Sequence, residues 1–368
     1  MPAAKSPALP ALTSLRFFAA LAIVIHHCNG AFWPAAELGP LDAGVSFFFV
    51  LSGFILTYVY RDIGRCGTAW KDFYCARIAR IWPLHAVCLL LTILLVTAPE
   101  PFNPFALLAN VLLLHAWLPW DRIFFSYNYV SWSISTELFF YLTFPFLMAC
   151  KLRWILFGIA VSASIAVGLA GTAEWFDLDT WKTTANQLSA TGLLYTDPLT
   201  RFAEFLIGMA TARLFLRRLS LPQDTQLRWT LYELGSFALF CLGYLWLSSG
   251  KLINAAEQGG PMLYTLVTEW ADHVALAPFA ALLILVVAQQ RGMVARALSQ
   301  RWLVFAGEIS FALYLVHQLF LRAMQSYVAH PGTAEFAWYM MTILVAAVLL
   351  HTLVERPARR WLVSRIGR

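Results

Sequence analysis

The chain has 368 residues, of which 60% are apolar and only 12% are charged, and its mean hydropathy is +0.67. A typical soluble domain is about 45–50% apolar and about 25% charged, so the composition excludes a disordered protein and argues strongly against a soluble globular enzyme. The 26 Lys and Arg outnumber the 20 Asp and Glu, but they lie in short segments between apolar runs, so they indicate orientation in a lipid bilayer and no nucleic-acid partner.

Ten apolar runs have the length that a helix needs to cross the hydrocarbon core of a membrane. The predicted fold class is an all-α polytopic membrane protein, because the strands of a β-barrel would alternate in polarity residue by residue. The predicted spans are 14–33, 43–60, 78–98, 132–150, 154–171, 201–217, 229–249, 273–290, 302–322 and 336–354.

Charge decides the placement of the segment at about 105–132, whose apolar part is short. If this segment does not cross, 21 of the 26 basic residues lie on the same side of the membrane as the N-terminus. If it crosses, 12 lie on that side and 14 on the opposite side. The positive-inside rule therefore favours ten crossings, cytoplasmic N- and C-termini, and a re-entrant or outer-surface segment. Irregular backbone at that depth occurs only where it is buried in protein or lines a wet cavity, which hints at a site.

No repeat of 20–50 residues and no low-complexity linker divides the chain. Residues 1–368 are expected to form a single integral-membrane domain with no appended soluble domain. The sequence contains no Walker loop, GxGxxG, GxSxG or zinc-ligand spacing, so no metal is expected.

The first span carries two ionisable residues on one face. Arg16 and His27 are 11 residues apart, so they return to within about 20° on the helix and lie about 16 Å apart along its axis. An ionisable residue within a span is a functional hypothesis by default. Histidine suits proton transfer near neutral pH, although a lone histidine on an apolar helix is more often a packed core residue, and His26 lies beside it.

The second and third spans begin with contrasting patterns. The second span opens on the Phe-rich run 44–54, whose small residues, such as Ser52, permit close approach of another helix or of a ligand. Arg77 and Arg80 are three residues apart and share one helix face at the cytoplasmic mouth of the third span. They either anchor the topology or bind an anion, because guanidinium groups form strong charge-assisted bonds with phosphate.

Three later spans carry further polar residues. Glu137 lies one turn inside the start of its span, and pairing and a site role are equally open for it. Arg201 and Glu204 are three residues apart and can pair on one helix face. Tyr314 and His317 share a face of the ninth span.

In chain order, these motifs resemble the membrane acyltransferase 3 family over about residues 12–357. The first span is similar to the family's Arg and His eleven residues apart, and 44–54 resembles its GxDxFFVLSGF segment, with Ser46 where Asp is common. Residues 77–83 resemble its RRxxRIxP segment, with Ala76 replacing the first Arg. Similar signatures are found at 132–141, 201–208, 310–317 and 355–357.

The resemblance implies an acetyl-CoA-dependent O-acyltransferase in the bacterial inner membrane. Its acceptor would be a sugar hydroxyl of an extracytoplasmic or polyprenyl-linked exopolysaccharide repeat unit. The chain resembles the stand-alone members of the family, of the kind that acetylate exopolysaccharides such as xanthan. Outer aromatic residues would stack on sugar rings or form an interfacial belt; these are Trp117, Trp120, Tyr127 and Tyr129.

The likeness also suggests roles for the ionisable residues. Arg16, Arg77 and Arg80 are expected to hold the phosphates of cytoplasmic acetyl-CoA. His27 is expected to act as general base on the acceptor hydroxyl or to carry the acyl group as a covalent intermediate, and Glu137 to orient His27 or bind the sugar. The candidate substrate-binding residues are Ser52, Arg201, Glu204, Tyr314 and His317.

Two other functions stay open at this point. A polytopic glycan transporter or flippase would also need intramembrane charge and ten spans, but it would consume no acetyl-CoA. A membrane sensor or assembly protein would not need the basicity of His27. Protection of the purified protein against heat by acetyl-CoA would count against both.

Overall fold

The computed structural model describes residues 7–33, 41–63, 68–96, 102–180, 188–217, 225–328 and 331–366. Within these ranges every secondary-structure element is a helix or a helical turn, and the only β pairing is an isolated bridge between Trp120 and Leu188. The predicted all-α fold class is therefore confirmed. Five basic residues of the charge count lie outside the described residues: Lys5, Arg65, Lys182, Arg218 and Arg368.

Seventeen α-helices and six short 3₁₀ or π turns follow one another in the described residues. The α-helices are α1 (Pro10–Cys28), α2 (Gly44–Val59), α3 (Thr68–Leu95), α4 (Pro104–Val111), α5 (Asp121–Phe124), α6 (Trp132–Met148), α7 (Leu152–Trp175), α8 (Phe202–Arg217), α9 (Gln226–Ser248), α10 (Lys251–Gln258), α11 (Pro261–Leu266), α12 (Asp272–Val274), α13 (Ala277–Val287), α14 (Met293–Leu298), α15 (Arg301–Gln325), α16 (Thr333–Leu350) and α17 (Arg356–Ile366). The turns are η1 (Leu41–Ala43), η2 (His115–Trp117), η3 (Tyr129–Ser131), η4 (Gly192–Thr196), η5 (Val267–Ala271) and η6 (His351–Glu355).

Eight helices of the described residues are long and apolar enough to cross a membrane, so the chain is a polytopic membrane protein. The sequence predicted ten spans. Two of the ten predicted spans correspond to helices shorter than 18 residues: α6 has 17 residues and α8 has 16. Most residues of α8 are buried inside the protein, and a helix surrounded by other helices need not match the hydrocarbon thickness.

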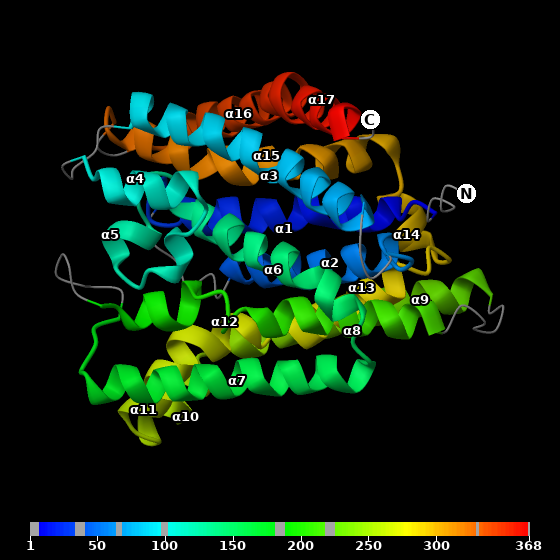
Figure 1. Cartoon of the computed structure of the whole chain (residues 1–368), viewed down its shortest axis with the longest axis horizontal. Helices are drawn as coiled ribbons and strands as arrows, with labels where there is room; N and C mark the ends of the chain where they lie inside the picture. Colours follow the sequence, from blue (N-terminus) through cyan, green and yellow to red (C-terminus); the bar gives the residue numbers. More distant parts are fainter. Residues whose placement is uncertain are drawn as a thin grey trace.

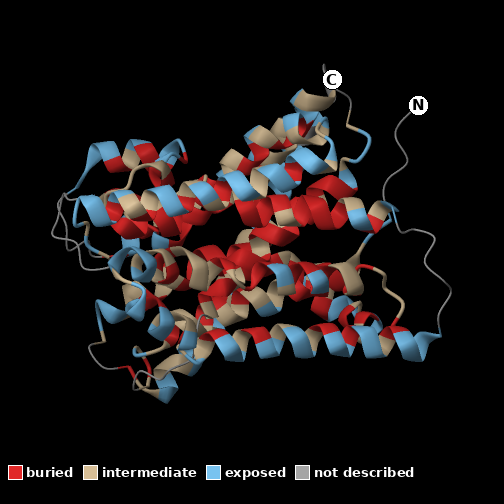
Figure 2. Ribbon diagram, turned by 90° about the horizontal axis from the view of Figure 1, so that it is seen from below, coloured by how far each residue is buried: buried red, intermediate tan, exposed pale blue. Residues whose placement is uncertain are grey.

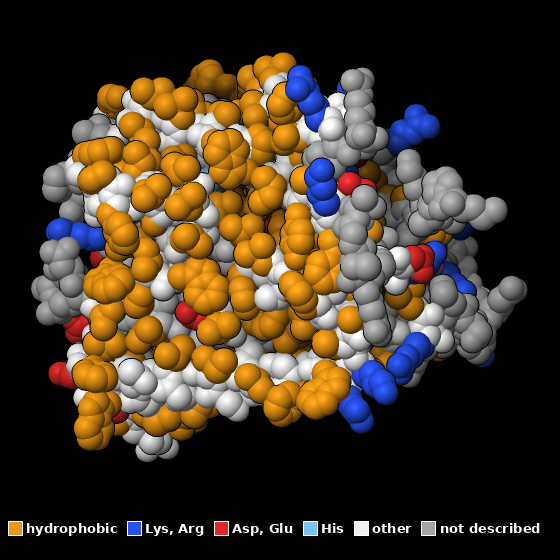
Figure 3. Space-filling model, viewed as in Figure 1, with side chains coloured by type: hydrophobic (Ala, Val, Ile, Leu, Met, Phe, Trp, Pro, Cys, Tyr) orange, Lys and Arg blue, Asp and Glu red, His pale blue; other side chains and the backbone are white. Residues whose placement is uncertain are grey.

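The long helices run roughly parallel, and their ends define two faces of the bundle (Figure 1). Both termini and α14 lie at one end, and α4, α5 and α10 lie at the other. Hydrophobic side chains cover the middle of the visible surface, and Lys and Arg gather mainly at the end with the termini (Figure 3). This distribution is the one that the positive-inside rule requires of a cytoplasmic end.

A buried polar network holds the segment between α3 and α6. His85 donates from Nε2 to the carbonyl of Asn110 at 3.0 Å, and the Asn110 amide donates to Ser126 at 2.6 Å. Ser131 lies 3.1 Å from Nε2 of His115, and burial lowers the pKa of His115 to about 3, so its ring is neutral. The helices of this segment are too short to cross a membrane, and side chains bond to its irregular backbone, as His85 does to Asn110 and Ser135 to the carbonyl of Leu113 at 2.7 Å.

Two pairs of central helices pack with backbones in close approach. A Cβ atom on Gly53 of α2 would overlap the carbonyl of Phe205, and one on Gly208 of α8 would overlap the carbonyl of Val50. Gly307 of α15 meets the backbone of α1 at Thr13 in the same way. Small residues permit such contacts between membrane helices. The residues buried by this packing form the centre of the molecule (Figure 2).

Glu233 of α9 should contribute strongly to stability, because its carboxylate caps α14. The side chain is 0% exposed and accepts from the backbone N–H groups of Gly292, Val294 and Ala295 at 2.9–3.1 Å. Glu233→Gln replaces one oxygen by a donor and leaves buried N–H groups unpaired, so we expect a loss of about 2–3 kcal/mol. The measurement is the thermal unfolding midpoint of the purified protein in detergent.

The matched control is Glu257→Gln on α10, where the carboxylate is exposed and the expected change is within about 0.5 kcal/mol. Equal midpoints for the Glu233→Gln protein and the unsubstituted protein would contradict the capping role.

Candidate active site

Three of the predicted arginines line one cavity of about 220 Å³, which we call the arginine cavity. Arg16 comes from α1, and Arg77 and Arg80 come from α3. Glu137 of α6 is the carboxylate in the lining, so three positive charges face one negative charge. The cavity lining is completed by Leu12, Thr13, Val45, Phe48, Phe49, Leu51, Ser52, Ile55, Leu56, Ser133, Ile134, Tyr141, Phe311 and Tyr314.

The guanidinium of Arg77 is held between two tyrosine rings. It donates from one terminal nitrogen to the hydroxyl of Tyr60 at 3.2 Å, and its carbon lies 5.5 Å from that ring and 5.9 Å from the Tyr141 ring. Its Nε atom is buried and has no hydrogen-bond partner within the described residues. A buried donor without a partner is costly, so this geometry favours an anionic ligand that would accept from it.

Glu137 belongs to the arginine cavity and does not contact His27 within the part of the chain that the structure describes. Its Oε1 atom accepts from Ser52 at 3.2 Å and from Tyr141 at 2.5 Å. It also lies close enough to Arg16 and Arg80 to offset part of their charge. No contact among the described residues therefore supports the expectation that Glu137 orients His27. The bond between Glu137 and Ser52 does bring two of the predicted site residues together.

A second and larger cavity, of about 1000 Å³, contains His27 and is here called the histidine cavity. It reaches the end of the bundle opposite the termini, where α9 passes into α10. Its lining consists of Ile23, His26, His27, Asn29, Asp42, Val45, Phe125, Tyr129, Val130, Trp132, Tyr195, Leu247, Ser248, Ser249, Gly250, Ile253, Asn254, Thr268, Asp272, His273, Tyr314 and Gln318. His27, the predicted catalytic residue, thus lines this polar cavity and not the arginine cavity.

The hydrogen bonds of His27 fix which ring nitrogen carries the proton. Nδ1 lies 2.9 Å from the carbonyl oxygen of Ile23. A carbonyl can only accept, so Nδ1 is the donor, and Nε2 of the neutral ring carries the lone pair. Nε2 has no hydrogen-bond partner among the described residues. The ring is therefore arranged as a proton acceptor toward the cavity.

His317 approaches the His27 ring within hydrogen-bond distance. Its Nε2 lies 3.2 Å from Nδ1 of His27, and its own Nδ1 donates to the carbonyl of Tyr314 at 2.6 Å. His317 is 0% exposed and is absent from the lining of both cavities. The predicted substrate-binding residue therefore supports the orientation of His27 from behind.

Arg201 and Glu204, also predicted to bind substrate, line neither cavity. They form a salt bridge of 3.0 Å with side chains that are 1% and 0% exposed. The Arg201 guanidinium lies 5.4–5.7 Å from the rings of Phe49, Trp132 and Tyr195. Since Trp132 and Tyr195 line the histidine cavity, the pair supports its aromatic wall, and helix spacing alone does not reveal that the pair is enclosed.

Asp42 and His273 are site residues that the sequence analysis did not single out. Their side chains lie 2.8 Å apart in the histidine cavity, and Tyr195 donates to Asp42 at 3.4 Å. The available signal was their position, because each ionisable residue lies at the edge of a predicted span. Of the four outer aromatic residues suggested for sugar stacking, Tyr129 lines this cavity; Trp117, Trp120 and Tyr127 do not.

Comparison with known proteins gives a family match over most of the chain. The model of a family described as "Acyltransferase domain" matches residues 9–355. The acyltransferase MdmB of Streptomyces mycarofaciens is 31% identical, over 97% of this chain and 93% of MdmB. The O-acetyltransferase OatA of Staphylococcus aureus is 24% identical, and the match covers 96% of this chain but 57% of OatA. No solved structure matches.

Proposed function

The chain belongs to the acyltransferase 3 family of membrane-bound acyltransferases, and from this premise we propose that it transfers an acetyl group from acetyl-CoA to a sugar hydroxyl across the membrane. The acceptor is an extracytoplasmic or lipid-linked carbohydrate, such as an exopolysaccharide repeat unit, and the protein acts as one domain in a bacterial inner membrane. Family membership favours this function over glycan transport without acyl transfer.

The observation that carries the proposal is the pair of cavities. One holds three arginines and one carboxylate in the half of the bundle that ends at the termini, and the other holds His27 and reaches the opposite end. The phosphates of CoA carry about four negative charges, which the excess positive charge of the arginine cavity offsets. A donor from the cytoplasm and an acceptor from outside can thus approach the same point from opposite sides.

The chemistry follows from the tautomer of His27. Nε2 of His27 takes the proton of the acceptor hydroxyl while the hydroxyl oxygen attacks the carbonyl carbon of the thioester. The tetrahedral intermediate collapses, the C–S bond breaks, and the CoA thiolate takes the proton from Nε2, which leaves an ester and free CoA. During the step Nδ1–H of the imidazolium stays bonded to the carbonyl of Ile23, and Nε2 of His317 is a second acceptor for the same N–H at 3.2 Å. His317 therefore acts as a positioning residue.

The same nitrogen also fits the competing route, in which Nε2 attacks the thioester and His27 carries the acetyl group before the sugar hydroxyl accepts it. Intact-protein mass spectrometry after mixing with acetyl-CoA alone separates the two routes. An added acetyl group that the His27→Gln protein does not acquire supports the covalent route, and an unmodified protein supports direct transfer.

Arg77→Ala should weaken acetyl-CoA binding by about 10–100-fold, because a hydrogen bond to a charged group contributes about 1.5–3 kcal/mol. The measurement is the rise in thermal unfolding midpoint of the detergent-purified protein over a range of acetyl-CoA concentrations, which gives the affinity. S-Acetyl-pantetheine, which has no phosphate, should protect the unsubstituted and Arg77→Ala proteins equally.

Arg153→Ala is the matched control, since this arginine is exposed at the start of α7 and lines neither cavity. Its affinity for acetyl-CoA should stay within about twofold of the unsubstituted value. A protein that acetyl-CoA does not protect at all would overturn the proposed donor site, and equal affinities for the Arg77→Ala and unsubstituted proteins would remove the phosphate assignment.

A further inference from the structure

The arginine and histidine cavities meet at two residues. Val45 of α2 and Tyr314 of α15 are the residues common to both linings within the described part of the chain. On the arginine side, Phe48 and Ile134 are part of the apolar lining; on the other side lies His27. An acyl group that passes from a donor in the first cavity to an acceptor in the second must therefore pass Val45 and Tyr314.

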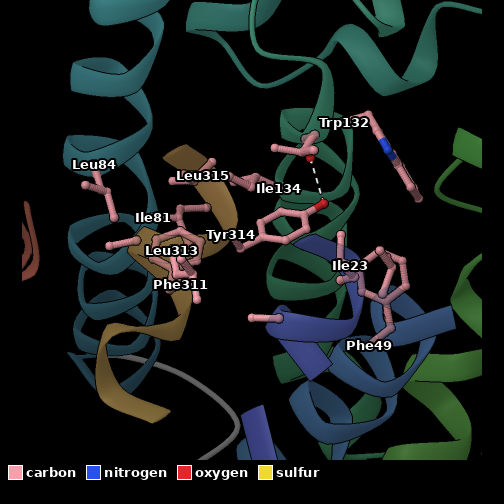
Figure 4. Close-up of a cluster of buried hydrophobic side chains, with 14 of the residues drawn as sticks. Ile23, Phe49, Ile81, Leu84, Trp132, Ile134, Phe311, Leu313, Tyr314 and Leu315 are labelled. Atoms are coloured by element: carbon pink, nitrogen blue, oxygen red, sulfur yellow. Dashed lines mark hydrogen bonds between the residues drawn. The ribbon is translucent and has the colours of Figure 1, made fainter. Parts of the chain in front are cut away.

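Tyr314 is a fixed part of this boundary. Its hydroxyl lies 2.9 Å from the carbonyl of Val130 and 2.8 Å from the hydroxyl of Ser133. Its ring centroid lies 6.2 Å from that of Phe48 and 5.7 Å from that of His317. Figure 4 shows the ring directed toward the start of α6, with a dashed hydrogen bond at its hydroxyl. Moving the ring would break two buried hydrogen bonds, so the ring is a fixed wall of the boundary.

Val45 is the part of the boundary whose size a substitution can change without breaking a hydrogen bond. It is 5% exposed, lies in the first turn of α2 and has a side chain without polar atoms. The arginine cavity follows α2 from Leu56 to Val45, a rise of about 16 Å over 11 residues. With the phosphates at Arg77 and Arg80, the pantetheine arm extends along this length, and its thioester end lies against Val45.

We propose that Val45 and Tyr314 together limit the size of the acyl group that the protein accepts, with the volume of the Val45 side chain deciding between acetyl and longer acyl chains. This inference rests on the proposed function, since it requires a CoA thioester in the arginine cavity. One methylene too many in an apolar pocket reduces acceptance by about 10–200-fold. A branched side chain at the residues that the two cavities share therefore excludes butyryl while admitting acetyl.

The test compares affinities and needs no identified acceptor. The detergent-purified protein is mixed with CoA, acetyl-CoA, propionyl-CoA, butyryl-CoA or hexanoyl-CoA, and the shift of its unfolding midpoint gives each dissociation constant. We expect the unsubstituted protein to bind acetyl-CoA at least about tenfold more tightly than butyryl-CoA. Val45→Ala should reduce this ratio to about threefold or less, and Val45→Leu should raise it.

Ile55→Ala is the matched control, because Ile55 lines the arginine cavity far from the boundary. This variant should keep the acetyl-to-butyryl ratio of the unsubstituted protein. An unchanged ratio in both Val45 variants, or an equal shift in Ile55→Ala, would overturn the inference while leaving the donor site intact. If neither CoA nor any thioester raises the midpoint of the unsubstituted protein, the proposed function fails and the inference fails with it. If Val45→Ala does not fold, the Val45→Leu ratio decides.

Discussion

His27→Gln is expected to reduce acyl transfer by about 10²–10⁴-fold, the usual contribution of a positioned general base. Glutamine is similar in size and its amide can still donate to the carbonyl of Ile23, the bond that His27 makes at 2.9 Å. It has no basic nitrogen to replace Nε2. The variant should therefore fold and bind acetyl-CoA normally but transfer almost no acetyl group.

The measurement is alkali-released acetate from surface and secreted glycans. A deletion strain is complemented with the unsubstituted gene or with the variant, at equal abundance of the protein in membranes. Acetate restored by the first and absent with the second would support transfer dependent on His27 and would identify the acceptor glycan.

His26→Gln is the control on the neighbouring residue. His26 also lines the histidine cavity, with its ring 5.3 Å from that of His27, but it lacks the contact with His317. We expect a loss smaller than about tenfold, because a removed side chain that only lines the cavity takes away binding contacts and no proton acceptor. Full restoration of acetate by His27→Gln, or equal losses for both variants, would contradict the assignment of the base.

Gly208→Leu is expected to prevent formation of the folded protein. Even a Cβ atom at this position overlaps the carbonyl of Val50 and approaches the backbone of Phe54, and backbone cannot move aside as a flexible side chain can. Overpacking typically costs about 1–3 kcal/mol where side chains yield, and here two central helices, α2 and α8, must separate. The measurement is the yield of monodisperse protein after detergent extraction, together with its unfolding midpoint.

Gly235→Ala is the matched control, because a Cβ atom on this glycine of α9 meets nothing within 4 Å. Alanine in a helix is more favourable than glycine by about 0.5–1 kcal/mol, so the midpoint should stay the same or rise. A Gly208→Leu protein with the yield and midpoint of the unsubstituted protein would show that α2 and α8 do not depend on this contact.

The sequence alone predicted several features that the structure contains. Apolar runs predicted the helices, since a span must satisfy its own backbone hydrogen bonds in lipid and therefore has to be a long apolar helix. The residue spacing also placed Arg77 and Arg80 on one face of α3, and both line the arginine cavity. These features depend on neighbours within one helix, which the order of residues encodes directly.

The tertiary structure decided which helices share a cavity. The sequence left open whether Glu137 orients His27 or binds the sugar; the packing brings Glu137 to Ser52 and brings His317 to His27 over a separation of 290 residues. It also encloses Arg201 with Glu204. Helical periodicity gives the direction of a side chain around its own axis, but it does not specify the neighbouring helix.

The boundary between the two cavities illustrates the same division. Nothing in the local sequence distinguishes Val45 from the other apolar residues of its run, and Tyr314 lies 269 positions further along the chain. They meet because α2 and α15 both pack on α1 in the centre of the bundle. The sequence by itself determined the membrane helices and their charged faces, because these follow from hydropathy and periodicity; the meeting point of the two cavities follows only from the packing of the helices.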